Sequence, residues 1–248
     1  MTALATLPSI DECYRVLKKT NSNVVWEILR QSDKFFQWEH YPKGDVYDSE
    51  THAQYYYHAH DPNTSTRLPE HGHFHLFLRQ KGIPSSLPPA HIPEKWQLDN
   101  NGDSLCHLIA IAMDVQGYPL RLFTVNRWVT GETWYDADAV ISLLDLFFID
   151  HTWPSWPTNI WLTQMVRLHK NTIIQLLKER DENFKKWVLQ HPDRNPYEDR
   201  ELEVLSSLDL SSSSNNPSSG NDPSSGNDPS SGNNPSSGNG ANNRLVVD

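Results

Sequence analysis

Residues 55–79 read YYYHAHDPNTSTRLPEHGHFHLFLR, and the predicted fold is organised around this segment. It contains five of the twelve histidines of the chain, spaced in one H-x-H and one H-x-H-x-H pattern: His58, His60, His71, His73 and His75. Alternate side chains of a β-strand lie on the same face of a sheet. The segment therefore predicts two strands, 54–60 and 71–79, joined by a turn-rich connection that contains Pro62 and Pro69.

The two predicted strands could form an antiparallel hairpin. In such a pair the numbers of facing residues add up to a constant. If His60 faces His71, the register contains the pairs His60–His71, His58–His73 and Tyr56–His75. All five imidazoles then lie on one face, with facing Cβ atoms about 4.5–5.5 Å apart. A slip of one residue would send one set of histidines to the opposite face.

Imidazoles that converge in this way can bind a metal ion at a distance of about 2.0–2.1 Å. Neutral imidazole suits Zn, Fe, Cu or Ni, and the sequence does not choose among these divalent transition metals. We therefore predict a metal site formed by His58, His60, His71, His73 and His75. The alternative interpretation is that the histidines are polar members of a half-buried sheet, hydrogen-bonded to tyrosines or to backbone carbonyls.

Glu70 directly precedes His71 and is the candidate catalytic residue, as a general base. As a ligand it would complete a site of two histidines and one carboxylate, the arrangement of non-haem iron oxygenases. An H-x-H strand with a later acid also resembles the first metal motif of cupin barrels, but Glu70 lies ten residues after His60 and the glycines of that motif are missing. His107 begins another predicted strand and could join the same face, although a structural role is the alternative.

The remaining pattern predicts helices at both ends of one domain. Apolar segments at 105–114 and 120–128 flank a Gly-Pro turn and predict a second hairpin. A capping box of Ser9 and Glu12 begins a helix, and others are expected over 24–31, 137–149, from Thr158 or Asn159 to about Arg180, and over 182–190. The segments 38–48 and 82–103 are rich in turn residues and are expected to be loops, and the turn at Tyr41–Pro42 to be a plain one.

We therefore predict a single α+β domain, residues 1–207, with an antiparallel sheet of about four strands. The N- and C-terminal helices would cover one face of the sheet. The other face would carry the histidines, shielded by the loop over 82–103.

Residues 208–248 are predicted to be a disordered tail. From Asn215 a six-residue unit repeats four times, as NNPSSG, NDPSSG, NDPSSG and NNPSSG. The unit contains no apolar residue, so it cannot bury enough surface to offset the entropy lost on ordering the backbone.

Composition excludes several classes of protein. The formal net charge of −10 argues against nucleic acid as a partner, because phosphate binding needs a basic surface. The most apolar segment, 139–149, is too short to span a bilayer and contains Asp145, and no basic amphipathic membrane helix is present. Cys13 and Cys106 lack the spacing of a disulfide framework or thiolate zinc site. Without a secretory signal at the N-terminus, we expect a cytoplasmic protein with no membrane partner.

Several strings are distinctive: EHGHFHLFLR at 70–79, HLIAIAMDVQGYPLRLF at 107–123, NRWVTGETW at 126–134 and MVRLHK at 165–170. In these the chain resembles an uncharacterised bacterial family, a domain of unknown function. The resemblance covers roughly residues 9–180 and excludes the repeat tail. It implies the domain boundary and no activity.

Three functional hypotheses follow from the histidine pattern. The first is a metal-dependent enzyme acting on a small molecule, as an oxygenase or a hydrolase, with the metal as Lewis acid or activator of water. The second is a non-catalytic carrier of a metal or small ligand that uses the same face. The third is an interaction protein whose histidines are structural.

Overall fold

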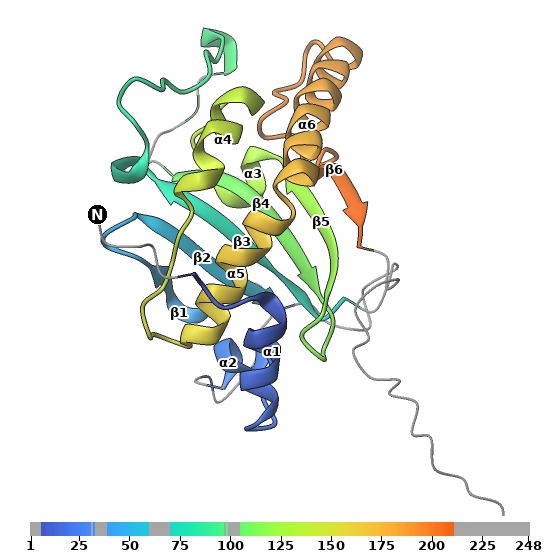
Figure 1. Ribbon diagram of the computed structural model, residues 1–248. Coiled ribbons are helices and arrows are strands. Elements are labelled where there is room, and N and C mark those ends of the chain that lie inside the picture. The colour runs from blue at the N-terminus through green and yellow to red at the C-terminus, as the bar shows by residue number, and fades with distance from the viewer. Residues whose placement is uncertain are drawn as a thin grey trace, which may run out of the picture. The chain divides into compact units, whose positions relative to one another are not determined.

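Six antiparallel strands, paired in chain order, form one sheet in the computed structural model of this chain (Figure 1). The structure describes residues 6–30, 32, 39–59, 70–96, 98 and 105–210. These residues all belong to one compact unit, 1–212. The strands are β1 (His40–Tyr47), β2 (Ala53–Ala59), β3 (Gly72–Arg79), β4 (Leu105–Met113), β5 (Pro119–Val125) and β6 (Val204–Asp209).

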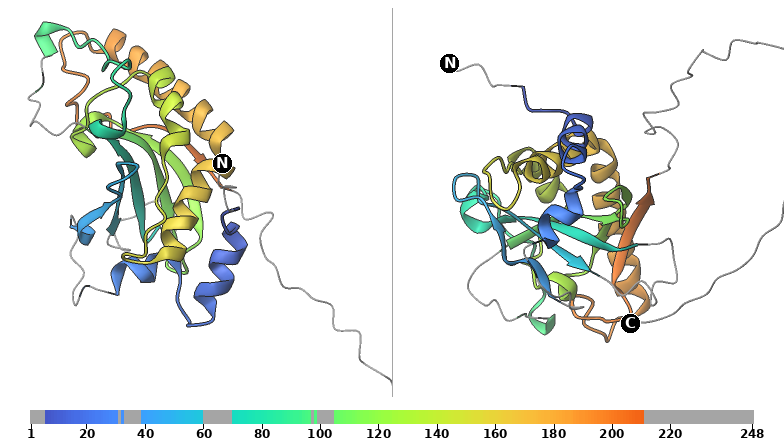
Figure 2. Two further views of the ribbon diagram at one scale, coloured as in Figure 1. Left: turned by 60° about the vertical axis from the view of Figure 1, so that its left-hand side comes forward. Right: turned by 90° about the horizontal axis from the view of Figure 1, so that it is seen from below.

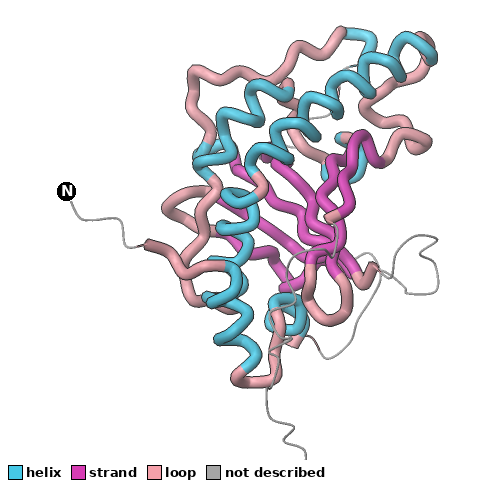
Figure 3. The backbone as a smooth tube through the Cα atoms, turned by 45° about the vertical axis from the view of Figure 1, so that its right-hand side comes forward, coloured by secondary structure: helices cyan, strands magenta, loops and turns pink. Residues whose placement is uncertain are grey.

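Helices cover one face of this sheet. They are α1 (Ile10–Lys18), α2 (Val24–Leu29), α4 (Ala137–Leu143), α5 (Trp156–Leu168) and α6 (Lys170–Gln190). The short helix α3 (Arg127–Thr130) follows β5, and its Val129 packs against Ala110 and Phe123 on the other face. Figures 2 and 3 show α4, α5 and α6 as a layer on one side of the strands. The predicted combination of helices and an antiparallel sheet is therefore confirmed. No helix within the described ranges is long and apolar enough to cross a membrane.

Alternation along the strands divides their side chains between the two faces. The main apolar core contains every second residue of β2 and β3, packed with residues of the helices such as Trp161 and Val166: Tyr55, Tyr57, Phe74, Leu76 and Leu78. The intervening residues lie on the opposite face: Tyr56, His58, His73, His75 and Phe77. The face that carries the histidines is thus opposite the layer formed by α4, α5 and α6 (Figures 2 and 3).

The register of β2 and β3 is the predicted one. His58 faces His73, and Tyr56 faces His75. The third predicted pair contains His60, which lies outside the described residues.

The sheet has six strands, whereas about four were predicted. The first additional strand is β1, which lies in the segment expected to be a loop because of Pro42 and Gly44. β1 is an edge strand, where proline is tolerated. Its pairing with β2 shifts between Tyr41 and Val46, around the left-handed residues Gly44 and Asp45. The Tyr41–Pro42 peptide is cis, so the expectation of a plain turn there was wrong.

The second additional strand is β6, which closes the other edge of the sheet beside β5. Its short sequence VLSSLD follows a charged segment that suggested only a short helical stretch. The N–H of Leu210 donates to the carbonyl of Leu120 at 2.8 Å, so the folded part includes residues 208–210, which the sequence assigned to the tail. The repeat tail itself, with its predicted disorder, lies outside the described residues.

Boundaries of helices and strands also differ from the prediction, and the helix expected over 137–149 ends at Leu143 and is followed by a 3₁₀ turn, Leu144–Leu146. The long helix predicted to end near Arg180 is interrupted at His169, between α5 and α6, and α6 then continues without a break to Gln190. The strand predicted over 120–128 ends at Val125, because Asn126 accepts a hydrogen bond from the N–H of Arg127 and begins α3. At the N-terminus the predicted Ser9 cap is confirmed by its hydrogen bond from the N–H of Glu12 at 3.2 Å.

A buried polar link fastens the sheet to α5. The Tyr55 hydroxyl donates to Oδ1 of Asn159 at 2.6 Å, and both side chains are fully buried. Nδ2 of Asn159 donates in turn to the carbonyls of His151 and Trp153 at 2.8 and 3.0 Å. One amide group therefore joins β2, α5 and the loop before α5.

We expect Tyr55→Phe to lower the free energy of unfolding by about 1–3 kcal/mol, because Oδ1 of Asn159 would stay buried without its donor. Urea unfolding measures the change. The matched control is Tyr47→Phe, the same substitution on an exposed side chain, which should cost less than about 0.5 kcal/mol. Equal effects of the two substitutions would show that the link does not stabilise the fold.

Candidate functional site

We use the name histidine face for the sheet surface opposite the helices. Its side chains on β2, β3, β4 and β5 include Tyr56, His58, His73, His75, Phe77, His107 and Phe123. The imidazole centroids are 5.4 Å apart for His58 and His73, 4.6 Å for His73 and His75, and 5.1 Å for His75 and His107. The face therefore brings together three of the predicted ligands and adds His107.

The deepest contact of the histidine face joins two imidazoles. Nδ1 of His75 lies 3.1 Å from Nε2 of His107, and the two residues are 1% and 3% exposed. Burial lowers the pKa of His75 well below its usual range and that of His107 to about 3, with Arg180 lowering the latter further. Both rings are therefore neutral at neutral pH, and a single proton lies between them.

The position of that proton follows from the second partner of His107. The Ile109 backbone raises the pKa of His107, which favours an N–H on Nδ1, the ring nitrogen that does not face His75. A neutral ring carries only one N–H, so we assign Nε2 of His107 as the acceptor and Nδ1 of His75 as the donor. Nε2 of His75 is then left with a lone pair, buried and without a partner among the described residues.

The carboxylate of Glu70 orients the imidazole of His73. Nδ1 of His73 lies 3.1 Å from Oε1 of Glu70, and Arg121 donates to Oε2 of the same carboxylate at 2.8 Å. Arg121 also lies over the ring of Phe123, 5.1 Å from its centroid. With its N–H directed to Glu70, a neutral His73 carries its lone pair on Nε2.

His71 does not join this face, although the alternating pattern predicted that it would. Its Nδ1 lies 2.9 Å from the hydroxyl of Tyr57, whose ring belongs to the main core on the helix side. His71 precedes the first residue of β3, so strict alternation no longer fixes its direction. Gly72 permits this arrangement, since a Cβ atom there would come within 2.7 Å of the Tyr57 hydroxyl and 2.3 Å of the His58 carbonyl.

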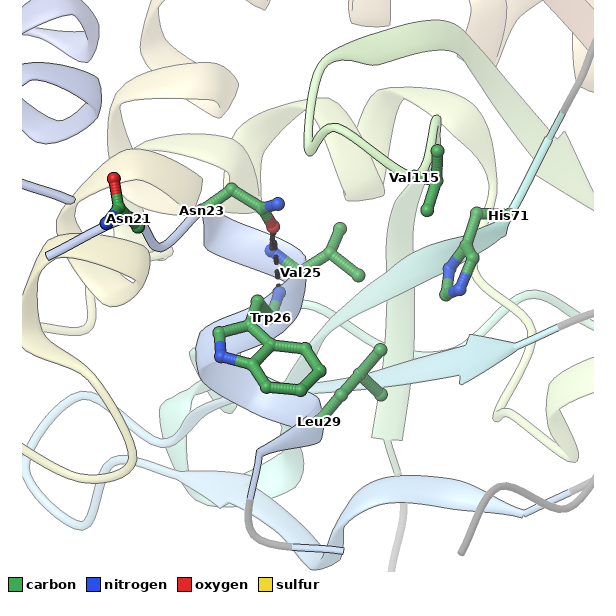
Figure 4. Close-up of a pocket in the computed structure, with 7 residues that line it drawn as sticks. All are labelled: Asn21, Asn23, Val25, Trp26, Leu29, His71 and Val115. Atoms are coloured by element: carbon green, nitrogen blue, oxygen red, sulfur yellow. Dashed lines mark hydrogen bonds between the residues drawn. The ribbon is translucent and has the colours of Figure 1, made fainter. Parts of the chain in front are cut away.

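The surroundings of His71 are a separate pocket of about 280 Å³ (Figure 4). It is lined by residues of α2 and the segment before it, and by the tip of the β4–β5 hairpin: Asn21, Asn23, Val25, Trp26, Leu29 and Val115. Of the five histidines predicted as ligands, three lie together, His71 lies in this pocket, and His60 lies outside the described residues.

His40 is a member of the histidine face that the sequence did not predict. It faces His58 in the β1–β2 register, and its ring stacks on that of Tyr56 with centroids 3.6 Å apart. Its Nδ1 lies 3.1 Å from Oδ1 of Asp45, and its side chain is 47% exposed. Because β1 was expected to be a loop, no alternation pattern linked His40 to the other histidines.

A buried carboxylate supports β4 beside the histidine face. Oε2 of Glu132 accepts a hydrogen bond from the backbone N–H of His107 at 2.8 Å, and Glu132 is 1% exposed. Burial raises the pKa of Glu132 from 4.5 to about 7, while Arg180 opposes the rise.

The loop over 82–103 was expected to shield the histidine face. Its first described residues, Ile83 and Leu87, pack with the main core. Its later ones, Ala90, Ile92, Trp96 and Leu98, pack against a second apolar cluster of Trp134, Phe184, Tyr197, Leu202 and Leu205. The described part of the loop therefore packs with these two clusters.

The distances between the imidazole centroids indicate which rings could share one metal ion. Two rings that share one metal at about 2.0–2.1 Å have centroids about 4.5–5.3 Å apart. The spacings of His73 from His75 and from His58, 4.6 and 5.4 Å, lie close to this range. In the ranges that the structure describes, no three His, Cys, Asp or Glu side chains already have the arrangement of a metal site. Rotation of the rings about χ2, a broad torsion, would be required.

The fold and this face define an α+β protein with a polar, histidine-lined sheet surface. A family model described as Domain of unknown function (DUF6969) matches residues 4–210 of the chain, which belongs to this family. The resemblance expected over roughly 9–180 is thereby confirmed, and the match extends through β6. No curated protein and no solved structure matches the chain.

The raised pKa of Glu132 predicts a pH dependence of stability. The folded chain holds the proton of Glu132 more tightly than the unfolded chain, so this contribution is complete below about pH 4.5 and is lost as the pH rises through about 7. Relative to Glu132→Gln, the wild type should gain roughly 2–3 kcal/mol in free energy of unfolding between about pH 8 and about pH 5. Urea unfolding at both pH values measures this difference.

The substitution of the exposed Glu94 by Gln is the control, and it should show no comparable pH dependence. A wild-type advantage over Glu132→Gln that is the same at both pH values would contradict the assignment.

Proposed function

We propose that the histidine face binds one divalent transition metal, Zn, Fe, Cu or Ni, through the Nε2 atoms of His58, His73 and His75. The observation that carries this proposal is the buried lone pair on Nε2 of His75, which has no partner among the described residues. Buried polar atoms are normally satisfied, and one that is not calls for a bound group such as an ion. Neutral imidazole nitrogen is a good ligand for these metals.

The hydrogen bonds behind the rings support the same proposal. A histidine that binds a metal commonly donates its second N–H to a carboxylate or another acceptor, which fixes the ring and its tautomer. Glu70 stands in that position for His73, and His107 does so for His75. Because both oxygens of Glu70 are engaged, we assign Glu70 the role of a positioning residue in place of the general base.

Three imidazoles leave a coordination position open on a tetrahedral metal, the arrangement found in catalytic zinc sites. A metal held in this way can polarise a small molecule or activate water. The proposed function is therefore that of a metal-dependent enzyme acting on a small molecule. In the alternative, a carrier, a fourth histidine would close the shell, and His60 is the predicted ligand available for it.

We expect the wild type, expressed with added metal, to retain close to one equivalent of zinc or cobalt per chain by elemental analysis. His75→Phe keeps an aromatic ring in the buried position and removes the nitrogen, so it should abolish binding. His73→Gln should do the same. His91→Gln, which changes an exposed histidine of the loop, is the matched control and should bind like the wild type.

Wild-type protein that remains metal-free, or equal binding by His75→Phe and the wild type, would contradict the site. Azide added to the cobalt form separates the two functions. An open position predicts a change in the visible spectrum on azide binding, and a closed shell predicts none.

A further inference from the structure

We propose that His40 is an uptake ligand, which takes a metal ion at the protein surface and passes it along the row of imidazoles to the buried site. This inference rests on the metal site proposed above. It adds the route by which the ion arrives and a role for a residue outside the final ligand set.

Burial along the row changes in one direction. His40 lies on the edge strand β1 with its side chain 47% exposed, and His58, which faces it on β2, is half-buried. His73 faces His58 on β3 and is 7% exposed, and His75 is 1% exposed. Three neighbouring strands therefore lead from solvent to the nitrogen of His75 that has no partner among the described residues.

The steps along the row are short enough for direct transfer. Facing residues such as His40 and His58 have Cβ atoms about 4.5–5.5 Å apart. The next two steps, to His73 and then to His75, are 5.4 and 4.6 Å between centroids. The ring pairs His58–His73 and His73–His75 can hold one ion together at these spacings, so the ion can gain the next ligand before it leaves the previous one. For the first step the ring of His40 turns from its stack on Tyr56 toward the facing His58.

Neighbouring side chains orient the ring of His40 so that its Nε2 can bind a metal ion. Its Nδ1 faces Oδ1 of Asp45 at 3.1 Å, and Gln54 holds Oδ2 of that carboxylate at 2.7 Å. The carboxylate thus accepts the N–H of His40 and leaves the lone pair on Nε2, as Glu70 does for His73. Stacking on Tyr56 at 3.6 Å restrains the ring, and Asp45 adds a negative charge that attracts cations.

If His40 acts only during metal transfer, its substitution changes the rate constants of binding in a way that distinguishes it from a final ligand or a packing residue. Affinity depends only on the free and bound end states, so a residue used only during transfer changes the association and dissociation rate constants by the same factor. A ligand of the final site would weaken the affinity instead. A histidine that merely packs on Tyr56 would change neither rate constant.

The test is stopped-flow mixing of the full chain with Co²⁺, followed by visible absorption, with dissociation measured by a chelator. His40→Ala should lower both rate constants at least about tenfold, which corresponds to about 1.4 kcal/mol, and leave the dissociation constant within about twofold. Asp45→Asn, which weakens the hydrogen bond that orients the His40 ring, should lower both rate constants less than His40→Ala does. His91→Ala, at an exposed position of the loop, should match the wild type.

Unchanged association in His40→Ala, or weaker affinity with faster dissociation, would overturn the uptake role while the metal site stands. If the wild type binds no Co²⁺, the proposed function fails, and the route fails with it. Circular dichroism of each variant verifies that the exposed substitutions leave the fold intact.

Discussion

The contact between Nδ1 of His75 and Nε2 of His107 constrains the rest of the histidine face. Two imidazoles at 3.1 Å in a buried environment cannot both be charged, and two neutral rings share one proton. The Ile109 backbone raises the pKa of His107 and so favours an N–H on its other nitrogen, and we therefore assign the shared proton to His75. The consequence is a buried lone pair on Nε2 of His75 that has no partner among the described residues. A bound cation would relieve that cost, and this is the basis of the proposed function.

The architecture of the sheet makes such a face possible. Helices on one side supply the apolar core, into which every second strand residue packs. The intervening residues lie outside this main core, and on the opposite face histidine and tyrosine pack beside a smaller apolar cluster that contains Ala110 and Phe123. The Tyr55–Asn159 hydrogen bond holds β2 against α5, and β2 carries His58 and Tyr56 on its other face. Packing of β2 against α5 on one face of the sheet therefore fixes the positions of His58 and Tyr56 on the opposite face.

The sequence predicted the centre of the sheet because local alternation was sufficient there. The H-x-H spacing and one assumed pair determined which residues of β2 and β3 face each other, and the His58–His73 pair has that register. Local alternation could not predict features that depend on contacts between residues far apart in the chain. β1 contains Pro42 and Gly44, which an edge strand tolerates, so both the strand and His40 were missed. His71 stands before the ladder begins, and its direction is set by the Tyr57 hydroxyl, a partner fourteen residues away.

The most direct test of this account is the tautomer of His75 in the metal-free protein, measured by ¹H–¹⁵N multiple-bond correlation NMR on histidine-labelled chain at neutral pH. The account predicts a neutral ring with the proton on Nδ1 and a lone pair on Nε2, and the Nε2 resonance should be the one that shifts when metal is added. A proton on Nε2, or a charged imidazolium, would contradict it.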